Sequence, residues 1–105
     1  MFSAERIQRL VPDVLLDIVG ELAYWRSCYP YRDFYSVRSP FEAYVPTFKF
    51  GYDSYLLHHK ERLFELMPKL EDRYLQLPAH EQLKWKNAEQ AIAASWQRMG
   101  AGPAI

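Results

Sequence analysis

The sequence has little of what would tie the protein to an extracellular site or a charged partner. It contains a single cysteine, Cys28, which excludes an internal disulfide and is typical of a reducing compartment. Its 13 basic and 13 acidic residues cancel, so no net field attracts nucleic acid or an anionic membrane. Asp17 and Glu21 interrupt the first apolar stretch, and the opening residues lack the apolar core of a signal peptide. We therefore expect a cytoplasmic protein that does not enter a membrane.

Recognisable catalytic and metal-binding patterns are also missing from the sequence. His58 and His59 are adjacent, so on a helix they point about 100° apart and cannot ligate one metal together. His80 begins like a zinc-protease helix motif, but Lys84 occupies the place of the second histidine. Cys28 is a candidate nucleophile, yet its surroundings match no catalytic pattern, and a free cysteine commonly packs as a small apolar side chain. We expect a protein that is not an enzyme and holds no metal or cofactor.

What is present is an ordinary globular composition, half hydrophobic and one quarter charged, over 105 residues. This length suits one domain with its own core. Gly100 is followed by another glycine and a proline, which favours the end of the last helix there. The sequence therefore predicts a single helical domain over residues 1–99 and a flexible tail over residues 100–105.

Apolar residues at helical spacing predict the first long helix, from Pro12 to Tyr29, after a short opening helix capped by Ser3. Gly20 lies inside this predicted helix, where glycine costs about 1 kcal/mol relative to alanine. We expect a close helix crossing at Gly20 to offset that cost. The predicted stripe consists of Val11, Leu15, Ile18, Leu22, Trp25 and Tyr29.

Two further stripes predict helices in the second half of the chain. One helix is expected to open at residues 51–54 and to break or kink near Met67, because Pro68 follows. The last helix is expected to open at residues 77–81 and to end at Gly100. The fold class is therefore all-α, a small bundle of three to four main helices. Its predicted core includes Leu15, Ile18, Leu22, Leu63, Leu70 and Ile92.

Between the first and second predicted helices runs a long aromatic-rich connection, within the stretch from Tyr24 to Tyr55. Pro30, Pro40 and Pro46 interrupt this stretch, so we expect it to be irregular. We expect one helical turn after Pro40 and an extended loop at residues 47–50. The stretch holds 12 of the 17 aromatic residues of the chain: Tyr24, Trp25, Tyr29, Tyr31, Phe34, Tyr35, Phe41, Tyr44, Phe48, Phe50, Tyr52 and Tyr55.

So many rings either pack between the helices or face a partner, and the sequence leaves both alternatives open. Trp25, Tyr29 and Tyr55 adjoin the helical stripes and are expected to point inward. Tyrosine and arginine dominate protein-binding hot spots, which favours another protein as the partner. A nucleic-acid-binding regulator that uses the same connection is the alternative, since bases stack on tyrosine and arginine. A homodimer is also compatible with the sequence. The predicted partner-binding residues are Tyr31, Arg32, Tyr35, Arg38, Phe41 and Tyr44.

Overall fold

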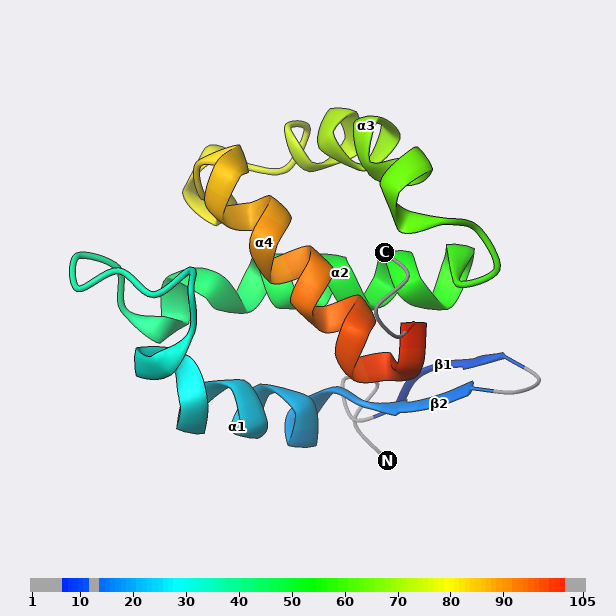
Figure 1. The fold of residues 1–105 in the computed structure, drawn as a ribbon, viewed down its shortest axis with the longest axis horizontal. Helices are drawn as coiled ribbons and strands as arrows, with labels where there is room; N and C mark the ends of the chain where they lie inside the picture. Colours follow the sequence, from blue (N-terminus) through cyan, green and yellow to red (C-terminus); the bar gives the residue numbers. More distant parts are fainter. Residues whose placement is uncertain (1–6, 12–13, 102–105) are drawn as a thin grey trace.

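Two crossing helices, α2 (Val45–His58) and α4 (Trp85–Trp96), form the centre of the protein (Figure 1). We obtained a computed structural model that describes residues 7–11 and 14–101. Helix α1 (Ile18–Cys28) packs against α2, and α3 (Leu63–Tyr74) packs against α4. The predicted all-α fold of three to four main helices is therefore confirmed, together with an irregular connection between α1 and α2.

A short antiparallel hairpin of β1 (Ile7–Val11) and β2 (Val14–Asp17) precedes α1 (Figure 1). The predicted start of the first helix near Pro12 is therefore wrong, and Leu15 lies opposite Leu10 in the hairpin. Asp17 has extended backbone angles and accepts a hydrogen bond from the Gly20 nitrogen at 3.2 Å, so it caps α1. The predicted cap at Ser3 and the last four residues of the predicted tail, 102–105, lie outside the described residues.

Helix α2 begins at Val45, six residues before Gly51, the first residue of the predicted opening of the second helix. Its first turn contains Pro46, whose missing N–H costs nothing there, so this proline starts a helix that it was expected to interrupt. The predicted extended loop at residues 47–50 and the predicted turn and cap at residues 51–54 are both wrong. Gly51 lies in mid-helix, where its position is explained by the neighbouring α4.

Pro68 lies inside α3, so of the predicted break or kink near Met67 the break is wrong. The chain breaks earlier, between the end of α2 at His58 and the start of α3 at Leu63. A proline inside a helix costs about 3 kcal/mol. Leu66 and Leu70, on either side of Pro68, are both almost fully buried, and each such burial contributes about 1.5–3 kcal/mol. Packing therefore offsets the lost helical hydrogen bond.

The last helix begins later than predicted. Residues 79–81 form a 3₁₀ turn, η3 (Ala79–Glu81), and α4 starts only at Trp85. Contacts with the end of α3 explain the extended chain between them: Gln82 donates to the Leu77 carbonyl at 2.8 Å, and the Leu83 nitrogen donates to the Tyr74 phenol at 2.7 Å. The predicted stop at Gly100 fits its left-handed φ of 101°.

The core lies between the helices and largely follows the predicted stripes. Ile18, Leu63, Leu70 and Ile92 are buried as expected, whereas Leu22 is only half-buried. The expected close crossing at Gly20 is wrong, because a Cβ at Gly20 would meet only the Asp17 side chain.

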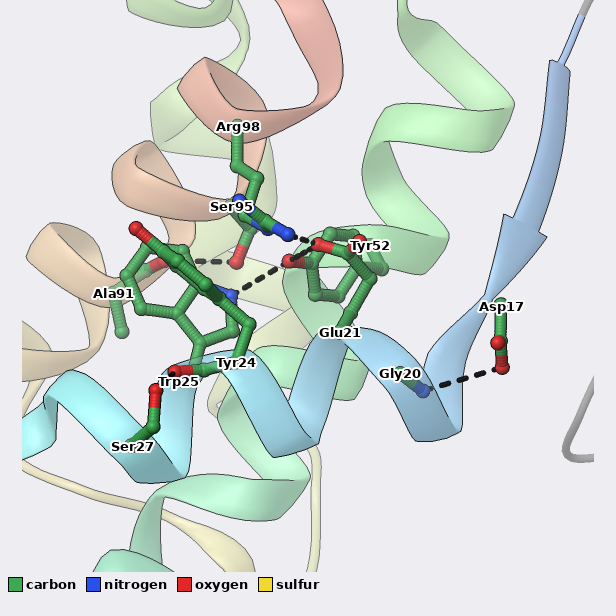
Figure 2. A network of polar contacts seen from close by, with 10 residues as sticks. All are labelled: Asp17, Gly20, Glu21, Tyr24, Trp25, Ser27, Tyr52, Ala91, Ser95 and Arg98. Atoms are coloured by element: carbon green, nitrogen blue, oxygen red, sulfur yellow. Dashed lines mark hydrogen bonds and ion pairs between the residues drawn. The ribbon is translucent and has the colours of Figure 1, made fainter.

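A polar network, buried at Trp25 and exposed at Arg98, joins α1, α2 and the turn η4 (Gln97–Ala101) that follows α4 (Figure 2). The indole nitrogen of Trp25 donates to the Tyr52 phenol at 2.6 Å, and that phenol donates to Glu21 at 2.6 Å. Arg98 donates to the same Glu21 oxygen at 2.6 Å and lies 3.5 Å from the centre of the Tyr24 ring. The network fixes the orientation of α1, from which the aromatic connection leaves.

Candidate functional site

The connection between α1 and α2 rests on a cluster of packed rings. The Trp25 ring of α1 stacks on the Phe48 ring of α2, with centroids 5.0 Å apart and an angle of 13°. Phe34, which belongs to the connection itself, packs against both rings and against Tyr44. Such aromatic contacts contribute about 0.5–1.5 kcal/mol each beyond buried area. The cluster therefore anchors the middle of an otherwise irregular segment.

Buried phenols also fix the backbone of the connection. Tyr29, in the 3₁₀ turn η1 (Tyr29–Tyr31), donates to the Ser39 carbonyl at 2.7 Å. Tyr44, in the 3₁₀ turn η2 (Phe41–Tyr44), donates to the Phe34 carbonyl at 2.6 Å. Burial raises the pKa of Tyr44 to about 12, so this phenol keeps its proton, and can donate, at an alkaline pH where an exposed tyrosine ionises. The two hydrogen bonds hold the loop in one shape.

Four of the predicted partner-binding residues are aromatic, and some of these four rings were expected to form an exposed patch. Tyr31 is 85% exposed and Tyr35 is 42% exposed. Phe41 and Tyr44 are buried, because both rings are covered by the aromatic cluster, so an exposed patch does not include these two predicted residues. The predicted turn after Pro40 is present as η2, and it is this turn that directs the two rings inward.

The arginines of the region differ in what they contact. The guanidinium of Arg32 lies 5.0 Å from the Trp25 ring centre, a cation–π geometry, and Arg38 is exposed. Arg26, on α1, lies 4.8 Å from the Phe41 ring centre and pairs with Glu42. The hydrogen bond from Arg26, with one from the Glu42 backbone, lowers the pKa of Glu42. These contacts form a charged rim beside the exposed tyrosines.

The exposed part of the connection adjoins a surface hollow of about 370 Å³ against α4. Val37 was not among the predicted residues, yet it is 84% exposed. We define the connection face as Tyr31, Arg32, Tyr35, Val37 and Arg38. The hollow is lined by Tyr31, Arg32, Asp33, Phe34, Gln90, Ala93, Ala94 and Gln97.

Cys28 and His58, two of the residues considered for catalysis, lie at the ends of different helices, α1 and α2. Cys28 is half-buried and packs partly against the core. The ring of His58 contacts Glu61 at 2.7 Å and Arg73 at 3.1 Å. Within residues 7–11 and 14–101, no group of three or more histidine, cysteine or acidic side chains is placed to hold a metal ion. Nor is any helix in that part of the chain long and apolar enough to cross a membrane.

A second groove, between α3 and α4, was missed by the sequence reasoning. It measures about 710 Å³, and its lining includes Phe64, which is 76% exposed. Phe64 directly follows Leu63 and therefore does not lie on the predicted buried face of the helix. This position in the sequence could have indicated that Phe64 is exposed. Comparisons with protein-family models, with curated proteins and with solved structures found no match for this chain.

Proposed function

We propose that this protein is a non-enzymatic adaptor or regulator that binds another protein in the cytoplasm through the connection face. The observation that carries the proposal is the exposure of Tyr31 and Val37, at 85% and 84%, on a segment whose neighbouring rings are buried. An irregular loop that only linked two helices would not require large apolar side chains pointing to solvent. Tyrosine and arginine are enriched in the residues that contribute most to protein binding.

The anchoring of the connection supports this function energetically. A flexible loop loses conformational freedom on binding, which costs about 0.5–1.5 kcal/mol for each ordered side chain. Here Phe34 and Tyr44 already hold the backbone through ring packing and a 2.6 Å hydrogen bond. A partner would therefore meet Tyr31 and Val37 on a preorganised surface, as rigid aromatic residues do in antibody loops.

The composition of the face favours a protein partner over nucleic acid, the alternative class. Arg32 already lies over the Trp25 ring, and the exposed Asp33 next to it would repel a phosphate. Val37 offers an apolar contact that a phosphate backbone does not use. The net charge of zero also favours a protein partner, because it gives no overall attraction to phosphates.

The test begins with affinity capture, followed by reconstitution with the purified partner. The double variant Tyr31→Ala/Val37→Ser should weaken that binding by at least about fivefold, which corresponds to roughly 1 kcal/mol. Both side chains are exposed, so the melting temperature should stay nearly unchanged. Leu57→Ser is the matched control, because Leu57 is 63% exposed but lies on α2, outside the connection face.

Two outcomes would contradict the proposal. Equal weakening by Leu57→Ser and by the double variant would show that binding does not depend on the connection face. Binding of labelled single-stranded DNA or RNA that is lost steeply with added salt, and is sensitive to Arg38→Ala, would establish the nucleic-acid alternative in its place.

A further inference from the structure

The groove between α3 and α4 has an apolar floor. Phe64, Met67 and Pro68 contribute from α3, and Trp85 and Ala93 contribute from α4. Phe64 is 76% exposed, and Met67 and Trp85 are half-buried. Pro68 has no N–H, so the Phe64 carbonyl lacks its usual helical donor. The groove thus presents apolar surface that the fold itself leaves uncovered.

The charged side chains that line this groove are all acidic. They are Glu65 and Glu71 of α3 and Glu89 of α4, and no lysine or arginine lines the groove with them. In the described part of the chain these three carboxylates have no ion pair, even though Lys69 lies four residues after Glu65 on α3. By contrast, Glu21 pairs with Arg98 in the same protein. The groove therefore has three carboxylates that form no ion pair in the described part of the chain, and its lining is acidic.

An apolar floor with an acidic border fits a particular kind of occupant. An amphipathic helix places apolar residues on one face at i, i+3, i+4 and i+7, and such a face can lie in a groove between two helices. Lysine or arginine at the edges of that face would meet Glu65, Glu71 and Glu89. We infer that the α3–α4 groove binds a basic amphipathic helix of a partner protein.

Charge argues against the other occupants of this groove. A second copy that docked symmetrically through the same face would bring its own three glutamates against these three. Nucleic acid would be repelled by the same carboxylates.

The inferred site goes beyond the connection face but is continuous with it. Gln90 and Ala93 of α4 line both the α3–α4 groove and the hollow beside Tyr31. A helix lying along α4 would extend toward the connection, so one partner can reach both surfaces. The connection face and the α3–α4 groove can still be tested separately, because Tyr31 and Val37 belong only to the face and Phe64 only to the groove.

The experiment uses a labelled synthetic helix of leucine and lysine, about 15 residues long, as the probe. A leucine–glutamate helix of the same pattern is its control. Binding is followed by anisotropy and by the emission of Trp85, which is half-buried while Trp25 and Trp96 are almost fully buried. The lysine helix should bind and shift this emission, and the glutamate helix should not.

Charge reversal in the groove then locates the binding. Glu71→Lys/Glu89→Lys should weaken the lysine helix by about tenfold or more, since two attractions become repulsions. Asp72→Lys, also on α3 but outside the groove, is the matched control and should change binding little. Phe64→Ala should also weaken binding, and circular dichroism should show that the variants keep their helices.

Three results would overturn the inference while leaving the proposed function open. One is no binding of the lysine helix, and another is equal loss in Asp72→Lys and in Glu71→Lys/Glu89→Lys. The third is self-association in sedimentation that Phe64→Ala abolishes, since a second copy would then occupy the groove. Tyr31→Ala/Val37→Ser should leave probe binding unchanged, and a loss there would place the probe on the connection face.

Discussion

Gly51 of α2 lies directly against Ser95 of α4. A Cβ at Gly51 would lie 3.0 Å from the Ser95 oxygen and 3.3 Å from the Ile92 Cα atom. The absence of a side chain at Gly51 therefore sets how closely the two central helices approach. Because the Ser95 hydroxyl donates to the Ala91 carbonyl at 2.9 Å, it is held in place and cannot move away without losing that bond.

Gly51→Ala should destabilise the protein, although alanine favours a helix by about 1 kcal/mol. Overpacking against α4 is expected to cost about 1–3 kcal/mol, which outweighs that gain. Urea unfolding measures the difference. In a double-mutant cycle, Ser95→Ala should recover part of the loss, because it removes the nearest atom. A more stable Gly51→Ala protein would show that the helices separate freely at this crossing.

Ile92→Ala should lower the free energy of unfolding by about 2–5 kcal/mol, from lost transfer energy and the cavity left behind. Ile92 has no exposed surface and lies on α4 against the core. Lys86→Ala, on an exposed position of the same helix, should change stability by less than about 0.5 kcal/mol. A similar loss of unfolding free energy in Ile92→Ala and in Lys86→Ala would show that Ile92 does not contribute to the core.

Tyr52→Phe should destabilise the protein by about 1–3 kcal/mol, because the buried Trp25 indole then has no acceptor. The same change removes the hydrogen bond from Tyr52 to Glu21. Tyr31→Phe is the matched control, since Tyr31 is 85% exposed and has no such role. Thermal and urea unfolding of both variants test the difference, and equal stability would mean that the network adds nothing measurable.

Tyr44→Phe should reduce the loss of stability at alkaline pH. Burial, with the nearby Tyr29 phenol, raises the pKa of Tyr44 to about 12, whereas an unfolded tyrosine has a pKa of about 10. Between these values the unfolded chain loses the proton and the folded protein keeps it, so stability falls as the pH rises. Urea unfolding from about pH 8 to about pH 11 should therefore show a shallower decline in Tyr44→Phe.

At neutral pH the same variant should be less stable than the wild type by about 0.5–1.5 kcal/mol, because it lacks the hydrogen bond to the Phe34 carbonyl. Loss of the hydrogen bond lowers the stability of Tyr44→Phe at neutral pH, whereas loss of the ionisable phenol makes its stability fall less at alkaline pH. An unchanged alkaline slope in Tyr44→Phe would show that another group controls the decline.

Local periodicity was sufficient to predict much of the buried surface. Ile92, Leu70 and Trp25 lie on stripes with helical spacing, and all three are buried. Helical geometry places such residues on one face of the helix whatever the surrounding fold, so their spacing in the sequence is enough to predict that face. Lying off every stripe does not by itself predict exposure: Tyr31 is exposed, whereas Phe41 and Tyr44 are buried.

The tertiary structure decided the features that depend on distant partners. Val11 and Leu15 fit the predicted helical stripe, but they belong to the two paired strands β1 and β2. Phe41 and Tyr44 have the local sequence of exposed loop residues, but other side chains cover them: the Tyr29 ring packs on Tyr44, and the Phe48 ring of α2 and the Arg26 guanidinium of α1 pack on Phe41.

Gly51 looks like a turn residue until α4 lies across it. The α3–α4 groove likewise joins Phe64 to Trp85, which are far apart in the chain. The sequence by itself determined that the chain forms several helices with apolar faces, because that pattern depends on neighbours three or four residues away. Where those faces meet, and what they leave uncovered, depends on contacts between distant segments, which only the folded chain brings together.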